Sequence, residues 1–279
     1  PSASLVLRRA GGRGLIVAAD FAVTGRATAT VHDLVNLLDA EYDIWETAPV
    51  PYGQEAGMTG EDQVDRWVRD IEGSGLPVHA VIGFCGGCVY AGRIAERIGR
   101  WQSVPRLILL DPGLVVPSMM VDHVAGVVRR LSGTFAPNDL AAAEQRLAAL
   151  LAEPGGSAAR ATPAAPGGPL ALADALAGYA REVIGPALER GAHSPDAGAG
   201  WVRLVTAYLY WLAGAAMLNP RQIWKSATAL QSCSPNFGLF LADPQERPTL
   251  VGSAEYFDVP HTDLMRTPEV AKAVDTLLV

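Results

Sequence analysis

The sequence predicts an α/β protein with a mostly parallel sheet that is covered by helices on both faces. Short apolar runs alternate along the chain with segments in which apolar residues recur at helical spacing. The apolar runs are continuous rather than interleaved with polar residues, as in strands buried on both faces of a parallel sheet. This alternation of strand and helix patterns stops after residue 113 and resumes after residue 218, which indicates a long insertion.

The composition is that of a globular protein and restricts its partners. With 279 residues, of which 49% are hydrophobic, the chain can bury a sizeable core. The net charge is −7 and there is no basic stripe, so we expect no nucleic-acid partner. Three cysteines are too few for a disulfide framework and favour a reducing compartment. The first residues lack the apolar run of a signal peptide, and no apolar stretch spans a membrane comfortably, so we expect a cytoplasmic protein without membrane contact.

The chain before residue 114 contains five predicted strands with helices between them. The strands cover residues 5–9, 15–19, 42–47, 77–84 and 105–111. Helical spacing is present in residues 31–38, 64–71 and 89–100. Asp111 ends the last of these strands and is followed by a Pro-Gly turn.

Residues 114–218 contain helical patterns and no convincing strand. We expect them to form a helical lid over a site at the end of the preceding strand, although a separate helical domain would give the same pattern. The α/β core would then consist of residues 1–113 and 219–279. Within the insertion, residues 154–169 are rich in Ala, Gly and Pro, and we expect this low-complexity segment to be mobile.

Two further strands are predicted after the insertion, at Phe237–Asp243 and Glu255–Val259. A loop at 260–263 follows, and then a closing helix at 269–278. The helical spacing turns three apolar residues of this helix inward, Val270, Val274 and Leu277.

A turn with the pattern G-x-C-x-G joins the strand that ends near residue 84 to the helix after it. Cys85 occupies the central position, and Gly83 and Gly87 flank it. This is the pattern of a nucleophile elbow, which needs small neighbours because strand and helix approach closely around a strained residue. The helix N-terminus behind Cys85 favours a thiolate and an oxyanion.

Two other interpretations fit the same turn. It could be a glycine turn of the kind that joins any strand and helix in an α/β fold. Cys85 and Cys88 also form a C-x-x-C pair at a strand-to-helix junction, which is typical of thioredoxin-like redox proteins. The remainder of the chain has to distinguish between these possibilities.

A nucleophile at an elbow needs a base, an acid that orients the base, and donors for an oxyanion. His261 follows the final predicted strand, which is where the chain order of hydrolases places the base. Asp111 and Asp243 each end a predicted strand, and both are candidates for the acid. As oxyanion donors we expect the backbone N–H groups of Gly86 and of Ala22, which follows the second strand.

Three segments resemble thioesterase domains of nonribosomal peptide and polyketide synthases, which have the α/β-hydrolase fold. They are Gly-Phe-Cys-Gly-Gly at 83–87, Leu-Leu-Asp-Pro at 109–112 and Asp-Val-Pro-His-Thr-Asp-Leu-Met-Arg at 258–266. The resemblance covers most of the chain outside the insertion. It implies Asp111 rather than Asp243 as the acid, since the acid of that family ends the strand after the elbow. The chain departs from the family in carrying Cys85 where Ser is usual.

The resemblance also bears on function. A thioredoxin-like fold would leave His261 and the insertion unexplained, so the redox interpretation is disfavoured. What the resemblance implies is release of an acyl or peptidyl chain from a carrier-protein thioester through an acyl-enzyme on Cys85, with ring closure to a macrocycle, lactone or lactam favoured. Hydrolytic release, a stand-alone editing thioesterase and a non-catalytic binding module are the alternatives. No metal or bound organic cofactor is expected, because the phosphopantetheine arm arrives with the carrier protein.

Overall fold

The computed structural model describes residues 3–11, 13–21, 28–152, 168–191 and 195–279. The chain divides into two compact units. The sheet unit comprises Pro1–Pro49, Glu61–Leu114 and Leu218–Val279. The helical unit comprises Val50–Gly60 and Val115–Met217, so it includes a short segment near residue 55 that the sequence assigned to the α/β core.

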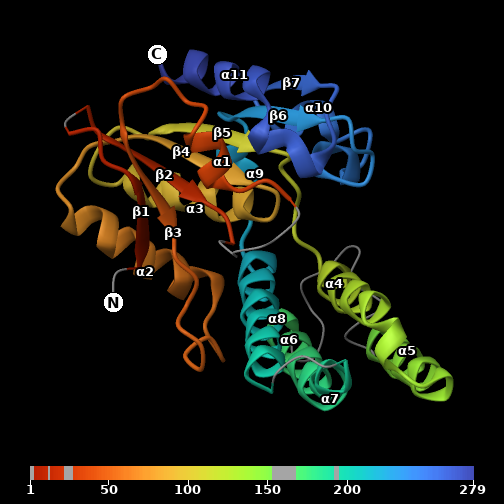
Figure 1. Ribbon diagram of the computed structural model, residues 1–279. Coiled ribbons are helices and arrows are strands. Elements are labelled where there is room, and N and C mark those ends of the chain that lie inside the picture. The colour runs from red at the N-terminus through yellow and green to blue at the C-terminus, as the bar shows by residue number, and fades with distance from the viewer. Residues whose placement is uncertain (1–2, 12, 22–27, 153–167, 192–194) are drawn as a thin grey trace. The chain divides into compact units, whose positions relative to one another are not determined.

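The sheet unit is built on a seven-stranded sheet with the order β1-β3-β2-β4-β5-β6-β7, counted over the described residues (Figure 1). Its strands are β1 (Ser4–Arg8), β2 (Leu15–Ala19), β3 (Asp43–Thr47), β4 (Val78–Phe84), β5 (Arg106–Leu110), β6 (Thr228–Ser232) and β7 (Ser253–Phe257). Only β1, which pairs with β3, runs antiparallel among these pairings. The mostly parallel sheet predicted from the continuous apolar runs is therefore confirmed.

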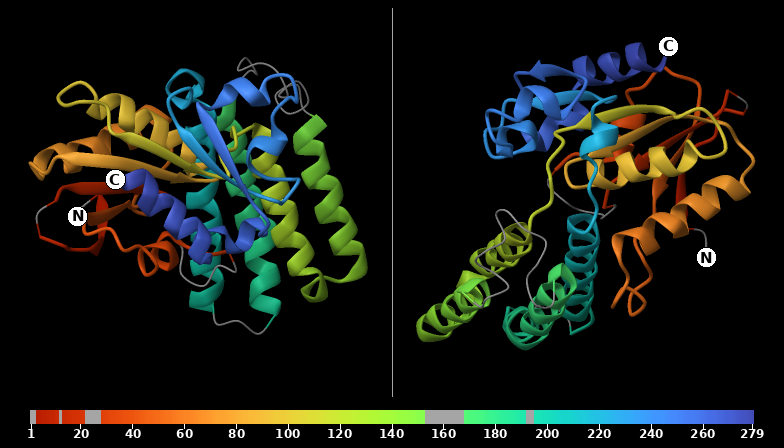
Figure 2. Two further views of the ribbon diagram at one scale, coloured as in Figure 1. Left: turned by 90° about the horizontal axis from the view of Figure 1, so that it is seen from above. Right: turned by 180° about the vertical axis from the view of Figure 1, so that it is seen from behind.

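Helices cover both faces of this sheet, as predicted (Figures 1 and 2). The helices of the sheet unit are α1 (Val31–Val35), α2 (Gly60–Gly73), α3 (Gly87–Ile98), α9 (Arg221–Trp224), α10 (Arg247–Leu250) and α11 (Pro268–Leu278). Ile16, Ile82 and Ile108 pack in one cluster with Leu34 of α1 and Val274 of α11. The figures show α2 and α3 on the opposite face. Strands buried from both sides need apolar residues at consecutive positions, which accounts for their sequence pattern.

The register aligns the carboxyl ends of β4 and β5 and places β6 beside them. Phe84 at the end of β4 pairs with Leu110 at the end of β5, and Leu110 pairs with Leu230 of β6. In a parallel sheet the residues that follow such aligned ends emerge at one edge, which is where ligands bind in open α/β sheets. Cys85 and Asp111 directly follow the first two strands.

The helical unit contains no strand within its described part. It consists of α4 (Pro117–Arg130), α5 (Pro137–Ala152), α6 (Gly168–Tyr179), α7 (Gly185–Arg190) and α8 (Pro195–Ala216), with a π-helical turn at Ala180–Ile184 and a 3₁₀ turn at Ser132–Thr134. α8 packs against α6, and α4 contacts α5, α6 and α8. No helix in the described part of the chain is both long and apolar enough to cross a membrane. Most of the low-complexity segment at 154–169 lies outside the described residues.

One predicted strand is wrong. Residues 237–243 form a 3₁₀ helix, η3 (Gly238–Leu241), and a turn, whereas the strand of this region is β6 at Thr228–Ser232. A short apolar run does not distinguish a strand from a helical turn, and Gly238 has a φ of 61°, which breaks extended structure. The predicted loop at 260–263 also differs, because a 3₁₀ helix, η4 (His261–Arg266), begins at the histidine.

Candidate active site

Cys85 lies at a sharp turn between β4 and α3. Its φ is 51°, in the left-handed region that a residue with a Cβ rarely adopts. The strand and the helix meet closely around it: a Cβ on Gly83 would lie 2.5 Å from the Cα of Cys88, and a Cβ on Gly87 would overlap the carbonyl oxygen of Ala19. Glycines at these two positions therefore permit the turn, as the G-x-C-x-G pattern predicts.

Asp111 and His261 are paired in the interior of the sheet unit. The Nδ1 atom of His261 lies 2.7 Å from Oδ2 of Asp111. The side chain of Asp111 is fully buried, and His261 is only 6% exposed. Asp111 also has a positive φ, 48°, and it shares this feature with Cys85 alone among the described non-glycine residues. The residues that directly follow the central strands β4 and β5 thus both have strained backbones, and such strain is concentrated at functional sites in proteins.

Groups at the end of β6 and just after it complete the surroundings of this pair. The N–H of Ser232 donates to Oδ1 of Asp111 at 2.7 Å, so each carboxylate oxygen has a hydrogen-bond partner. The N–H of His261 donates to Oγ of Ser234 at 2.8 Å. One short segment therefore positions both the carboxylate and the histidine.

Cys85 is connected to the same cluster through its neighbours. Its N–H donates to the carbonyl of Leu110, the residue before Asp111, at 2.9 Å. The ring of Phe84, the residue before Cys85, is stacked on the His261 ring with the centroids 4.8 Å apart. The structure thus brings the predicted nucleophile, base and acid to the carboxyl edge of the sheet.

Of the two predicted oxyanion donors, the structure describes only Gly86, and the role of both stays a prediction. Gly86 is the N-cap residue of α3. The N–H groups at the start of a helix have no partners within the helix, so they can donate hydrogen bonds to an anion. Ala22 lies outside the described residues, so its placement as second donor stays a prediction.

The local structure around Asp243 does not support its predicted role as the acid that orients the base. It is exposed, and its Oδ1 accepts a hydrogen bond from the N–H of Gln245 at 2.8 Å. Because residues 237–243 form no strand, Asp243 does not end one, and the reason for considering it as the acid disappears. The carboxylate that contacts His261 is that of Asp111.

Two of the other described histidines, His79 and His123, pack against neighbouring groups and lie apart from this pair. The Nε2 atom of His79 lies 2.8 Å from the carbonyl oxygen of Leu278, and its ring is stacked on Tyr42. His123, in α4, packs against the Tyr208 ring at an interplanar angle of 63°. Burial lowers the pKa of His123 to about 4, with a smaller contribution from Arg130.

Cys85 and Cys88 are both free thiols, and Cys88 is fully buried behind the elbow. Its Sγ is 3.5 Å from the carbonyl oxygen of Leu110. Burial raises the pKa of Cys88 well above its usual range, and the nearby Cys85 and Asp111 raise it further. A thiol of this kind is unreactive at neutral pH. The third free thiol, Cys233, is exposed.

Sequence reasoning missed Ser232, Ser234 and Phe237, because it placed the strand at 237–243. Phe237 is stacked on His261 with ring centroids 3.8 Å apart and an interplanar angle of 8°. The only sequence signal was the short run Thr-Ala-Leu-Gln-Ser at 228–232, whose polar ends and single Leu gave little indication of a buried strand.

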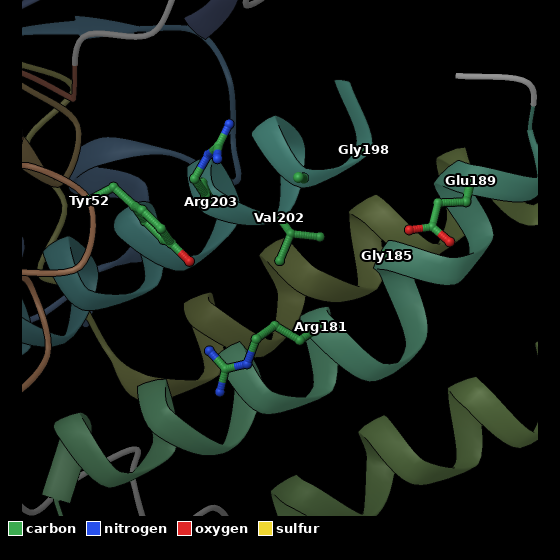
Figure 3. A pocket seen from close by; sticks show the side chains of 8 residues that line it. Tyr52, Arg181, Gly185, Glu189, Gly198, Val202 and Arg203 are labelled. Carbon is green, nitrogen blue, oxygen red and sulfur yellow. The ribbon is translucent and has the colours of Figure 1, made fainter. Parts of the chain in front are cut away.

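The helical unit has a pocket of its own, with a volume of about 230 Å³ (Figure 3). Its walls include the charged side chains of Arg181, Glu189 and Arg203, and the ring of Tyr52. The Cζ atom of Arg203 lies 5.7 Å from the centroid of the Tyr52 ring. Gly185 and Gly198 leave room between the helices. No cluster of three or more His, Cys, Asp or Glu side chains that could hold a metal ion occurs in the described part of the chain.

No protein-family model matches the chain, and no curated protein matches it. Solved structures are similar to it at low sequence identity. The NocB thioesterase domain, in a covalent complex with a fluorophosphonate nocardicin G analogue, is 17% identical with a TM-score of 0.52, over 96% of each chain. The Vlm2 thioesterase domain carrying 2,3-diaminopropionic acid with a dodecadepsipeptide is 15% identical with a TM-score of 0.51, over 98% of this chain and 97% of that chain. The enol-lactonase from Burkholderia xenovorans LB400 is 14% identical with a TM-score of 0.52, over 99% of this chain and 95% of that chain. Together with the seven-stranded sheet, these likenesses assign the chain to the α/β-hydrolase fold.

Proposed function

We propose that this protein is a thioesterase that releases an acyl or peptidyl chain from a carrier-protein thioester through an acyl-enzyme on Cys85. The observation that carries the proposal is the buried pair of His261 and Asp111 beside the strained Cys85 turn. Nucleophile, base and orienting acid are the groups that acyl transfer requires. The similar structures support this choice of reaction, because two of them are thioesterase domains and one is a lactonase.

In the first step Sγ of Cys85 attacks the thioester carbonyl. Nε2 of His261 takes the thiol proton and then gives it to the departing thiol of the carrier arm, so a new thioester forms as the old one breaks. Asp111 keeps the proton on Nδ1 of the imidazole and stabilises the imidazolium that forms in between. The N–H groups of Gly86 and Ala22 donate to the oxyanion of the tetrahedral intermediate.

In the second step another nucleophile takes the acyl group from Cys85. We propose that this nucleophile is an amine or hydroxyl of the chain itself, so that the product is a macrocycle, lactone or lactam. Transfer from a thioester to Cys85 is close to thermoneutral, so the acyl group stays activated, and thioesters react with amines much more readily than oxyesters do. Water is the alternative nucleophile, and it would give hydrolytic release or, with short chains, editing.

Substrate delivery in this proposal requires a carrier protein. The phosphopantetheine arm is part of that partner, and the reaction uses protein side chains with no resident metal or organic cofactor. The helical unit would act as the lid, since a lid that excludes water would protect the acyl-enzyme from hydrolysis until the internal nucleophile attacks.

Intact-protein mass spectrometry with a panel of acyl-pantetheine thioesters tests the proposal. We expect one acyl adduct, which peptide mapping places on Cys85, and no adduct at that site in Cys85→Ala. Cys233→Ser is the matched control, because Cys233 is an exposed thiol that could be acylated without catalysis. A folded protein that forms no acyl-enzyme on Cys85 with any member of the panel would be a binding module instead. A preference for short acyl groups over peptidyl ones would identify an editing enzyme.

A further inference from the structure

The imidazole of His261 is enclosed by two aromatic rings that come from different parts of the sheet unit. Phe237 is stacked on the imidazole, with ring centroids 3.8 Å apart and an interplanar angle of 8°. Phe84 is also stacked on the imidazole, with ring centroids 4.8 Å apart and an interplanar angle of 13°. A ring that is nearly parallel at 3.8 Å covers a whole imidazole face, so the second ring has to lie against the other face. The stack is therefore Phe84, His261, Phe237.

The two rings are held in different ways. Phe84 is the last residue of β4 and is almost fully buried, so the sheet fixes it. Phe237 is 37% exposed and lies in the turn before η3, where no strand supports it. The support for Phe237 has to come from the contacts of this turn.

Gln231 supplies that support. Its side chain is completely buried at the end of β6. Its Oε1 accepts from the N–H of Leu239 at 2.7 Å, and its Nε2 donates to the carbonyl oxygens of Ser232 at 3.0 Å and Phe237 at 3.4 Å. The turn fits closely over this amide, since a Cβ on Gly238 would overlap the Gln231 side chain. One amide thus binds the backbone on both sides of Gly238.

We propose that Phe237 is a positioning residue for His261, and that Gln231 holds Phe237 in place. The inference rests on the proposed role of His261 as the base. With Nδ1 bonded to Asp111 and both ring faces covered, the imidazole cannot rotate about its Cβ–Cγ bond without losing the stack. Water is excluded from the faces, so the Nδ1 proton is protected from exchange while the Nε2 edge stays available to Cys85.

Two measurements on the whole chain test this proposal. The first is the downfield proton NMR resonance of the Nδ1–H in the hydrogen bond to Asp111, which is visible only if exchange with water is slow. The second is the rate at which iodoacetamide alkylates Cys85, followed by peptide mapping so that Cys233 does not interfere. Neither measurement needs a substrate.

We expect Phe237→Leu to broaden the Nδ1–H resonance and to slow alkylation of Cys85 about three- to tenfold. This factor corresponds to the free energy of one aromatic stacking contact. Phe237→Tyr keeps a flat ring and should restore both readouts. Gln231→Met should resemble Phe237→Leu, and in the double variant it should add little, because it acts through the same ring. Gly238→Ala, whose Cβ would overlap the Gln231 side chain and displace the same turn, provides a second perturbation if Gln231→Met fails to fold.

A sharp resonance and an unchanged alkylation rate in Phe237→Leu would overturn the inference. So would effects of Gln231→Met and Phe237→Leu that simply add. These failures differ from failure of the proposed function, in which Cys85 would form no acyl-enzyme although the resonance still responded to Phe237→Leu and Phe237→Tyr as expected.

Discussion

Two side chains in the candidate site sit on backbone conformations that cost energy. Cys85 and Asp111 have φ values of 51° and 48°, where a Cβ is crowded by the adjacent backbone. Each directly follows a buried strand, so the sheet holds the residue before it in place. Such strain persists only where surrounding structure fixes the chain, and here it directs two side chains away from their strands at the same edge.

At Cys85, the choice of sulfur over oxygen can be tested by Cys85→Ser. We expect the Ser variant to be acylated by the native chain or a close mimic, but to shift product from ring toward free acid or to stall as the oxyester. The reason is that an oxyester is a poorer electrophile toward an internal amine than a thioester. Liquid chromatography with mass detection gives the ratio of cyclic to linear product. An unchanged ratio and rate would show that thioester reactivity does not govern release, while leaving Cys85 as the nucleophile.

At Asp111, replacement of the carboxylate isolates its effect on His261. We expect Asp111→Asn to lower kcat/KM by about four orders of magnitude, as when the acid of another triad is replaced by its amide. Asn adopts a positive φ more easily than most residues, so the backbone should be preserved.

The matched control is Asp243→Asn, which changes an exposed carboxylate that bonds only to its own turn among the contacts described. It should keep activity within about twofold, as is usual for surface substitutions. If Asp243→Asn were the inactive variant and Asp111→Asn the active one, the pairing with His261 would have no catalytic meaning.

At the scale of the elements, α3 lies very close to the sheet at its first residue, Gly87. Gly87 faces the carbonyl of Ala19 in β2, and Gly83 of β4 faces the backbone of Cys88. Farther along α3, the backbone carbonyl of Cys88 accepts a hydrogen bond from Nε1 of Trp224 at 3.1 Å. Close packing against the backbone of β2 and against the start of α3 thus fixes the elbow.

A methyl group tests this packing. Gly87→Ala places a Cβ in the space of the Ala19 carbonyl oxygen, so α3 has to move. We expect a loss of about 3 kcal/mol of stability, the upper end for overpacking, and a fall in Tm of about 6–12 °C in thermal denaturation followed by circular dichroism. Gly113→Ala is the control, because a Cβ there meets nothing within 4 Å. Equal Tm values for the two variants would show that the approach of helix and strand is looser than described.

At the scale of the whole molecule, the chain forms two compact units. The sheet unit contains Cys85, Asp111 and His261, whereas the helical unit contains the pocket near Arg181 and Arg203. Units with their own cores can unfold in separate steps, so a perturbation in one need not alter the other.

His123 gives the helical unit its own pH dependence. Its pKa is about 4 in the folded protein, because burial disfavours the charged ring, against an ordinary value of 6.5. The unfolded chain therefore binds a proton first as the pH falls, and stability is lost between pH 6.5 and about 4. At pH 5 the free energy of unfolding should be about 1–2 kcal/mol lower than at pH 7.

Thermal denaturation at pH 7 and pH 5 measures this effect. His123→Phe keeps an aromatic contact with Tyr208 and should remove most of the difference in Tm between the two pH values. His32→Gln changes an exposed histidine of the sheet unit and should leave the difference as in the parent protein. The same pH dependence in His123→Phe and the parent would mean that another group is responsible.

The sequence by itself determined the features that depend on neighbouring residues. The elbow is one, because a buried strand, a glycine turn and an amphipathic helix occupy consecutive positions around Cys85. The continuous apolar strands are another, and they were enough for the sheet and its helical layers. The position of His261 after the last strand followed from chain order.

The tertiary structure alone decided which distant groups meet. His261 and Asp111 are 150 positions apart, and Ser232 and Asp111 are 121 apart, so no local pattern distinguishes these partners from other strand-end residues. The strand β6 was missed because five residues with one large apolar side chain give a weak signal, and the stronger apolar run at 237–241 folds over Gln231 instead. Phe237 contacts His261 only because this turn is held against the sheet. Such contacts arise from packing between segments, whereas periodicity reports only the surroundings of each segment.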